Sequence, residues 1–252
     1  MSNNARRNTR SKKEETGTGR VVKEKFQQER EESVRAKPLV AMNKKQQFYI
    51  DLLKEKPIVI ATGYAGSSKS YIPAVMAADL YKLNQIQKIY ITRPAVSSSK
   101  SVGYFKGTAE EKLSQWLGAV IPIFLDRLGR SMFEIAVDAG DISFVPLEVA
   151  KGLSINDAWF IVEEASDLTK EEVIKLITRM GKNSRLILAG DIRQAELEGE
   201  SGLHWLIKFV ERHQLSHNFG FVDFNDVNDI VRSDAVKQFI TCLVRDERKG
   251  ID

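Results

Sequence analysis

The sequence predicts an α/β fold of three layers, in which helices cover both faces of a parallel β-sheet. Apolar, strand-like segments alternate with helix-like segments along the chain, and this order is typical of parallel strands joined by crossover helices. Several strand-like segments, such as PIVIA and LILA, are continuous apolar runs, as expected of strands covered on both faces. The 252 residues suffice for one sizeable α/β domain and a tail.

The first half of the domain is expected to contain three helices and two strands. A helix over residues 44–54 precedes a strand over 58–62, after which a glycine-rich turn leads into a helix over 69–83. A strand over 88–92 and a long helix over 108–128 follow. The second half continues the alternation, with strands over 142–145, 159–162, 186–189 and 219–224 and helices over 170–180 and 202–214.

The composition is that of an ordinary globular protein. The single cysteine, Cys242, excludes an internal disulfide framework and fits a reducing compartment, where we expect it to be a small buried side chain. The N-terminus lacks the apolar core of a secretory signal, and no stretch approaches the roughly 18 apolar residues of a membrane span. These features predict a cytoplasmic protein without a membrane partner.

The positive net charge is concentrated in residues 1–37, which hold 11 basic and 6 acidic residues. This segment is polar, and the apolar positions within residues 20–35 are too few to anchor a helix to a core. We expect a basic N-terminal arm that is disordered or loosely helical, followed by the globular domain over residues 38–252. The arm could attract phosphate backbones, or it could simply be solvated.

The turn after the first strand has the pattern of a phosphate-binding loop. It reads GYAGSSKS and lies between a strand and a helix, which is the context that a P-loop requires. Its glycines allow successive N–H groups to converge on phosphate oxygens, and the helix N-terminus adds partial positive charge. Lys69 would reach the β- and γ-phosphates, and the Ser70 hydroxyl would ligate Mg²⁺. The predicted nucleotide cradle consists of Gly63, Tyr64, Ala65, Gly66, Ser67, Ser68, Lys69 and Ser70.

Ser68 stands where the P-loop pattern has glycine. Serine suits the start of a helix, so the turn can form, but the side chain takes up room beside the phosphates. The alternative interpretation is a Gly/Ser-rich connection followed by an accidental Lys-Ser pair.

Two acidic residues follow the apolar strand AWFIV. In P-loop ATPases the strand beside the loop ends in a carboxylate that helps to hold Mg²⁺, and a second carboxylate polarises the attacking water. Glu163 is the candidate for the first role and Glu164 for the second. We therefore expect their strand to lie beside the strand of the loop. A solvated pair of acids at a strand end is the alternative.

Three further segments carry candidate phosphate contacts. The strand RLILA is followed by Asp191 and Gln194, which could sense the γ-phosphate or orient water. Arg232 could neutralise charge that develops during phosphoryl transfer. The loop 93–100 leaves the strand KIYIT at the edge where open α/β sheets carry ligands, and it could contact phosphates of a nucleotide or of a nucleic acid. An ordinary turn, a surface arginine and a solvated loop are the respective alternatives.

The order of these motifs resembles that of a known family. The blocks are Asn43-x-x-Gln46, GYAGSSKS, ITRPAV, VGYFKGTAEEK, VPLEVAKG, NDAWFIVEEAS, ITRMG, LAGDIRQAEL, SGL and DIVRSD. Over residues 39–235 they resemble the PhoH-like ATPases of bacteria and their phages. The resemblance implies a RecA-like core related to superfamily-one helicases, ATP bound with Mg²⁺, work on RNA or single-stranded nucleic acid, and often a ring of identical subunits.

The resemblance also implies roles for single residues. Lys69 resembles the phosphate-binding lysine, Ser70 the magnesium-binding hydroxyl and Glu164 the catalytic glutamate. The further matches are Gln46 with an adenine-recognising glutamine, Asp191 and Gln194 with a sensor block, and Arg232 with an arginine finger that would come from a neighbouring subunit.

The chain departs from the family pattern at four positions, where the family has Gly at Ser68, Asp at Glu163, Gln at Ser166 and a basic residue at Leu153. Glutamate extends the carboxylate by about 1 Å, and a misplacement of that size can cost on the order of a hundredfold in rate. The predicted function is an ATP-binding, slow Mg²⁺-dependent NTPase of a bacterial cell or phage-infected host. The alternatives are a nucleotide-binding scaffold for RNA or a protein partner and, ranked lower, a helicase or ribonuclease.

Overall fold

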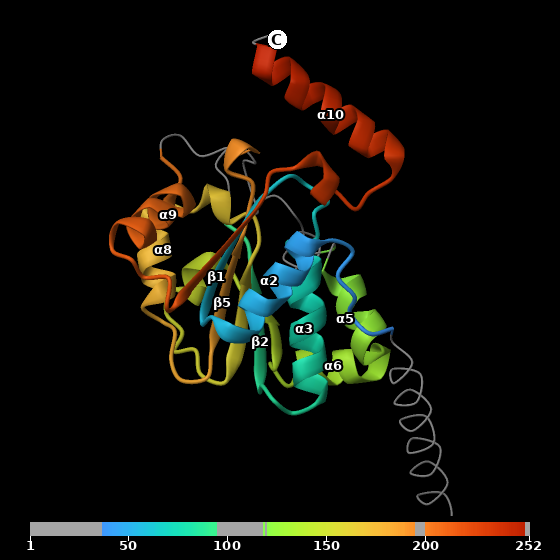
Figure 1. The fold of residues 1–252 in the computed structure, drawn as a ribbon. Helices are drawn as coiled ribbons and strands as arrows, with labels where there is room; N and C mark the ends of the chain where they lie inside the picture. The colour runs from blue at the N-terminus through green and yellow to red at the C-terminus, as the bar shows by residue number, and fades with distance from the viewer. Residues whose placement is uncertain (1–36, 95–117, 119, 195–199, 250–252) are drawn as a thin grey trace, which may run out of the picture.

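The computed structural model describes residues 37–94, 118, 120–194 and 200–249. The predicted arm, except Lys37, lies outside these residues, and so does most of the predicted loop 93–100. One sheet of six parallel strands forms the centre of the described domain (Figure 1). The strands are β1 (Ile58–Gly63), β2 (Lys88–Thr92), β3 (Ile142–Phe144), β4 (Ala158–Val162), β5 (Arg185–Ala189) and β6 (Phe219–Phe224). All six strands were predicted, and the parallel α/β fold is confirmed.

The strand order is β3-β2-β4-β5-β1-β6. The expectation that the strand of the acidic pair lies beside the strand of the loop is therefore wrong, because β5 separates β4 from β1. β5 pairs with β1 on one side and with β4 on the other, in parallel register. The four residues Leu186–Ala189 are all buried, which suits an interior position between two other strands.

Helices cover both faces of the sheet and produce the three layers (Figure 1). Alternate residues of β1 point into different cores: Val59 and Ala61 contribute to one, and Ile58 and Ile60 to the other. The first face carries α2 (Lys44–Glu55), α3 (Tyr71–Lys82), α5 (Ile121–Leu128) and α6 (Arg130–Asp138), and the second carries α7 (Leu147–Ala150), α8 (Lys170–Ile177) and α9 (Gly202–Arg212).

The predicted helix over 108–128 is confirmed over residues 121–128, which form α5, but the described residues before Ile121 are not helical. Gly118 and Val120 lie in turns, and α5 begins only at Ile121. Gly129, with a φ of 77°, ends α5, and α6 begins directly after it. The short helices α6 and α7 were not predicted. Residues 108–117 and 119 lie outside the described part of the chain.

A further helix that was not predicted, α10 (Asp234–Lys249), projects from the body of the domain (Figure 1). Its Val244 and Ile240 pack near Tyr64 and Ile230. Cys242 lies on this helix and is exposed, so the expectation of a buried cysteine is wrong. No helix within the described ranges combines the length and the apolar character needed to cross a membrane.

Candidate functional site

The loop between β1 and α3 follows a path that two of its glycines make possible. Gly63 has a φ of 116°, and a Cβ on it would lie 2.2 Å from the Phe224 carbonyl oxygen of β6. Gly66 has a φ of 82°, and a Cβ there would lie 2.5 Å from Cγ of Arg232. Side chains at either position would collide with neighbouring residues, and the left-handed backbone also favours glycine. The loop is therefore pressed closely against the segment that follows β6.

Ser68 has a left-handed backbone, with a φ of 71°. This conformation costs an L-residue roughly 1–2 kcal/mol, a penalty that glycine does not incur. The Ser68 hydroxyl accepts a hydrogen bond from Nε2 of Gln46 at 3.4 Å. Ser68 thus has a left-handed backbone at the position where the P-loop pattern has glycine. Its side chain contacts Gln46 of α2.

The Lys69 ammonium points back into the loop. It donates to the carbonyl oxygens of Gly63 at 2.6 Å and Tyr64 at 2.8 Å. Burial lowers the pKa of Lys69 to about 8, although the nearby Asp191 and Glu164 carboxylates oppose the shift. A phosphate group in the loop would compete with these two carbonyl oxygens for the ammonium group.

Glu163 and Ser70 lie in contact within the site. The Ser70 hydroxyl hydrogen bonds to the Glu163 carboxylate. Burial raises the pKa of Glu163, and the hydrogen bond from Ser70 opposes this effect. A hydroxyl and a carboxylate side by side are oxygen ligands of the kind that Mg²⁺ prefers. No cluster of three or more His, Cys, Asp or Glu that could hold a metal is found in the described residues, so these two would need phosphate or water oxygens to complete a coordination shell.

The carboxyl ends of β4 and β5 bring further acidic residues to the loop. Glu164 follows Glu163 with a left-handed backbone, φ 48°, and its side chain is exposed. Asp191 follows β5, is 4% exposed and forms an ion pair with Arg193, Nε to Oδ1 at 3.1 Å. Because β5 lies between β1 and β4, Asp191 stands between the loop and the acidic pair.

A cavity of ≈ 400 Å³ unites most of the predicted site. The predicted residues among its lining are Ala65, Gly66, Ser68, Lys69, Ser70, Glu163, Glu164, Asp191 and Arg232. Arg93, the first residue of the predicted phosphate-contacting loop, also lines it, whereas residues 95–100 lie outside the described part. Tyr71, Val120 and Ile123 were not anticipated and form an apolar part of the wall.

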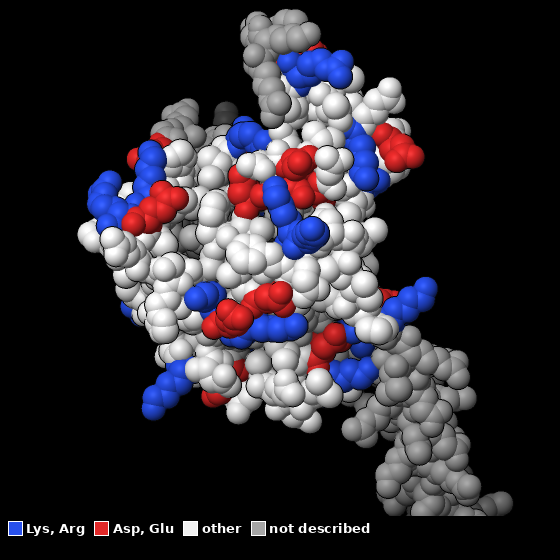
Figure 2. Space-filling view, in the orientation of Figure 1, with Lys and Arg blue, Asp and Glu red and all other residues white. Residues whose placement is uncertain are grey.

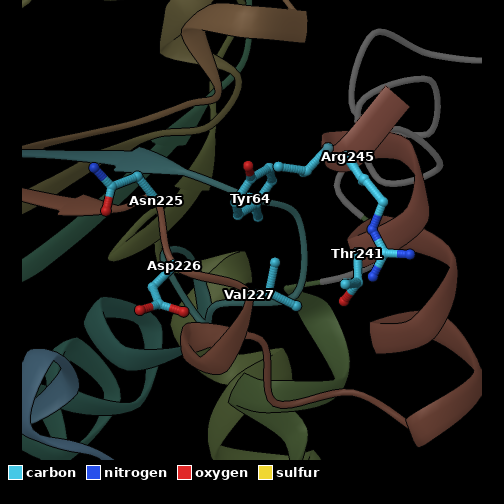
Figure 3. A pocket seen from close by; sticks show the side chains of 7 residues that line it. Tyr64, Asn225, Asp226, Val227, Thr241 and Arg245 are labelled. Atoms are coloured by element: carbon cyan, nitrogen blue, oxygen red, sulfur yellow. The ribbon is translucent and has the colours of Figure 1, made fainter. Parts of the chain in front are cut away.

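Four predicted residues that the structure describes in full are absent from this lining, namely Gln46, Gly63, Tyr64 and Ser67. Gln46 is 2% exposed, and its Oε1 accepts a hydrogen bond from the Met42 N–H at 2.8 Å while its Nε2 reaches Ser68. Gln194 is the last residue of a short 3-10 helix after β5, and its side chain lies outside the described part of the structure. Tyr64 lines a different cavity of ≈ 640 Å³, between the loop and α10 (Figure 3).

The Arg232 side chain lies against Gly66 of its own chain and lines the same cavity. The backbone supports this placement, since the Val231 N–H donates to the Gly66 carbonyl oxygen at 3.0 Å. The expectation that Arg232 acts on a neighbouring subunit stays a prediction.

Arg193 was missed by the sequence analysis. It joins Asp191 to the ring of Tyr64, whose centre lies 3.7 Å from the guanidinium carbon. Its position two residues after a strand-end aspartate, within the GDIRQ block, was the available signal. Basic and acidic side chains are interspersed on the face seen in Figure 2.

Comparison with known proteins agrees with these motifs. A family model described as PhoH-like protein matches residues 38–243. A PhoH-like protein of Mycobacterium tuberculosis is 29% identical over 220 residues, which make up 86% of this chain and 61% of that protein. A PhoH-like protein of Bacillus subtilis is 30% identical over 172 residues, 68% of this chain and 54% of that protein.

Protein PhoH of Escherichia coli is 29% identical over 198 residues, which make up 78% of this chain and 55% of that protein. The chain thus spans about half to three fifths of the length of these curated relatives. Because the family model covers most of the chain and the ordered blocks lie within the match, this chain belongs to the PhoH-like protein family.

Proposed function

We propose that this chain binds ATP and hydrolyses it slowly with the help of Mg²⁺. One observation carries the proposal: a single cavity at the carboxyl edge of the sheet is lined by Lys69 and Ser70 of the loop and by the acidic residues after β4 and β5. Phosphoryl transfer needs cationic and N–H donors on one side of the phosphates and carboxylates on the other. This cavity offers both.

The loop would hold the phosphates. α3 begins at Tyr71, directly after the loop, so its N-terminus would favour phosphate oxygens bound there, and Lys69 would exchange its two carbonyl partners for phosphate oxygens. Ser70 and Glu163 would hold Mg²⁺, which supplies charge neutralisation between the phosphates when it is bound.

The remaining residues of the cavity would carry out hydrolysis. Glu164 would accept a proton from the attacking water, because its carboxylate is exposed and lines the cavity. Asp191 and Gln194 would respond to the γ-phosphate from the end of β5. Arg232 would neutralise the charge that develops on the transferred group, acting from the same chain.

Slow turnover follows from two features of the site. Glu163 is longer than the aspartate of the family pattern, and its carboxylate is already hydrogen bonded to Ser70. Ser68 adds a side chain to the cavity wall at a position where glycine would leave space. Both changes would alter where the phosphates and the metal lie, but they leave the phosphate-binding loop in place.

Phosphate release from Mg-ATP tests the proposal directly. The wild type should show turnover that Lys69→Ala and Glu164→Gln abolish, while Glu164→Gln retains binding of a fluorescent ATP analogue. Turnover in the wild type no higher than in Lys69→Ala would reject hydrolysis. Absence of analogue binding in the wild type would reject the nucleotide site itself.

A second candidate is a nucleotide-binding scaffold that does not hydrolyse ATP, and the strained Ser68 together with the Ser70–Glu163 contact favours it. The basic arm would then hold RNA or a protein partner. Tight analogue binding without phosphate release would support this candidate. Deleting residues 1–37 should abolish RNA binding without changing nucleotide affinity. Unchanged RNA binding after this deletion would show that the arm is not the RNA-binding segment.

Assembly of identical subunits is a further part of the proposal. α10 presents Val236, Phe239 and Leu243 to solvent, with exposed fractions of 39%, 69% and 46%. These residues recur at positions i, i+3 and i+7 and therefore share one face of the helix. An exposed apolar helix face of this kind suits contact with a second copy of the chain, as a ring would require.

A further inference from the structure

Tyr71 is an exposed aromatic residue at the mouth of the phosphate cavity. It is the first residue of α3 and directly follows Ser70. Its exposed fraction is 48%, and it lines the same cavity as Lys69, Ser70 and Glu163. Neither the loop motif nor the acidic motifs account for this side chain.

The cavity has an apolar wall beside its charged one. Tyr71 shares the lining with Val120, which is 1% exposed, and with the partly buried Ile123 of α5. Phosphates need no apolar wall, whereas the flat faces of a nucleobase do. Phosphates held at the start of α3 would lie beside Tyr71, the first residue of that helix, so an attached nucleoside is within reach of its ring.

Two other candidates for the base contact are already engaged. Gln46 is buried, and both ends of its amide contact the protein, at Met42 and Ser68. The Tyr64 ring is 8% exposed and has Arg193 on one face, and it borders the separate cavity beside α10 (Figure 3). Among the aromatic side chains of the described residues, Tyr71 alone lines the phosphate cavity.

We propose that the Tyr71 ring stacks on the nucleobase of the bound nucleotide and supplies the main base contact of the site. This inference rests on the proposed nucleotide-binding function and adds its base subsite. A stacking contact recognises the flat face that every base has, so this subsite selects nucleotides over free phosphates rather than one base over another. Gln46 instead positions the loop through Ser68.

Calorimetric titration of the full chain with a non-hydrolysable ATP analogue and with inorganic tripolyphosphate, both with Mg²⁺, tests this inference. Tyr71→Ala should weaken binding of the analogue by roughly tenfold to a hundredfold, which is typical of losing one stacked base. Its affinity for tripolyphosphate should stay within about twofold of the wild type, since the phosphate contacts remain. Tyr71→Phe keeps the ring and should bind both ligands as the wild type does.

Two further variants make the test specific. Tyr71→Leu keeps apolar bulk at the start of α3 but lacks a flat ring, and it should lose analogue affinity as Tyr71→Ala does. Phe48→Ala is a matched control, because Phe48 is 52% exposed and helical geometry turns it away from Gln46 and the loop. It should bind both ligands normally.

The inference is overturned if Tyr71→Ala or Tyr71→Leu binds the analogue as tightly as the wild type. It is equally overturned if Tyr71→Ala loses tripolyphosphate and analogue to the same extent, because Tyr71 would then only support the loop. Failure of the wild type to bind either ligand would instead reject the proposed nucleotide site on which the inference rests. Thermal unfolding of each variant shows whether a loss arises from misfolding.

Discussion

The guanidinium carbon of Arg193 lies 3.7 Å from the centre of the Tyr64 ring. Tyr64 is the second residue of the phosphate loop, and Arg193 belongs to the short 3-10 helix after β5. The same guanidinium forms an ion pair with Asp191. Arg193 therefore connects the phosphate loop to Asp191. Asp191 lies between the loop and the two acidic residues that follow β4.

Arg193→Ala should lower the free energy of unfolding by about 0.5–2 kcal/mol, the range for a cation over an aromatic ring, and nearer the lower end because the side chain is 40% exposed. Urea unfolding at constant pH measures the change. Arg193→Lys keeps the charge without the planar group and should fall between alanine and the wild type. Unfolding curves for Arg193→Ala that coincide with the wild type would show that the contact adds no stability.

Nucleotide affinity should depend on pH through Lys69, whose pKa is lowered to about 8 mainly by burial. Phosphate favours the charged ammonium, so affinity should fall by no more than about twofold between pH 7 and 8. Above this pKa the free lysine must take up a proton on binding, and affinity should fall by up to about tenfold per pH unit. Titration of the ATP analogue from pH 7 to 9.5 measures the dependence.

The control is Lys69→Arg, whose guanidinium stays charged throughout this range and should remove the decline above pH 8. The free energy of unfolding should change with pH in the direction opposite to the nucleotide affinity. Because the folded pKa lies below the ordinary value of 10.5, the folded chain holds fewer protons than the unfolded chain between these values. The free energy of unfolding of the wild type, compared with that of Lys69→Met, should therefore increase as the pH rises from 8 to 10.5. If urea unfolding showed this difference decreasing with pH, it would contradict a pKa of Lys69 that is lowered by burial.

Ser68→Gly should raise the turnover of ATP. The substitution relieves the left-handed strain at φ 71° and removes a side chain from the cavity wall. Stability should change by no more than about 1 kcal/mol, because the relief is offset by the greater freedom of glycine in the unfolded chain. Ser68→Ala is the matched control: it keeps the Cβ and the strain but loses the hydroxyl, and its turnover should not rise. Equal rates for the two variants would reject crowding at this position.

Several parts of this fold follow from local sequence alone. The apolar runs of β1, β4 and β5 identify strands covered on both faces, and the GYAGSSKS turn between a strand and a helix locates the loop. Strand order does not follow from these runs. β5 is as apolar as β4, and only tertiary pairing decides which of them lies beside β1.

Site residues were predicted where a motif contains them and missed where only the fold brings them close. Lys69, Glu163 and Asp191 follow recognisable strand ends and meet in one cavity. Tyr71 and Arg193 adjoin those motifs, but their roles depend on the tertiary structure. Tyr71 lines a cavity together with Val120 from another segment, and Arg193 lies over the ring of Tyr64. The packing of Arg232 against Gly66 likewise depends on the path of the chain after β6.

Glu163→Asp should raise ATP turnover, by up to about a hundredfold if carboxylate position limits the rate. The shorter side chain withdraws the carboxylate from Ser70 and leaves room for a metal ion between the two oxygens. Rates measured across a Mg²⁺ titration separate tighter metal binding from faster chemistry. Glu163→Gln keeps the length without the charge and should reduce turnover at every Mg²⁺ concentration. Glu163→Asp with unchanged rate and Mg²⁺ dependence would remove Glu163 from the metal site.

Phe239→Asp should dissociate any assembly of identical subunits while leaving the monomer folded. Phe239 is 69% exposed on α10, whereas Val244 and Ile240 on the same helix pack near Tyr64 and Ile230. A charge at Phe239 would therefore disturb an intermolecular contact without entering the core. Sedimentation velocity of wild type and variant measures the assembly, and Phe48→Asp, at 52% exposure on α2, is the control. Phe239→Asp that sediments like an assembled wild type would place the contact between subunits elsewhere than on α10.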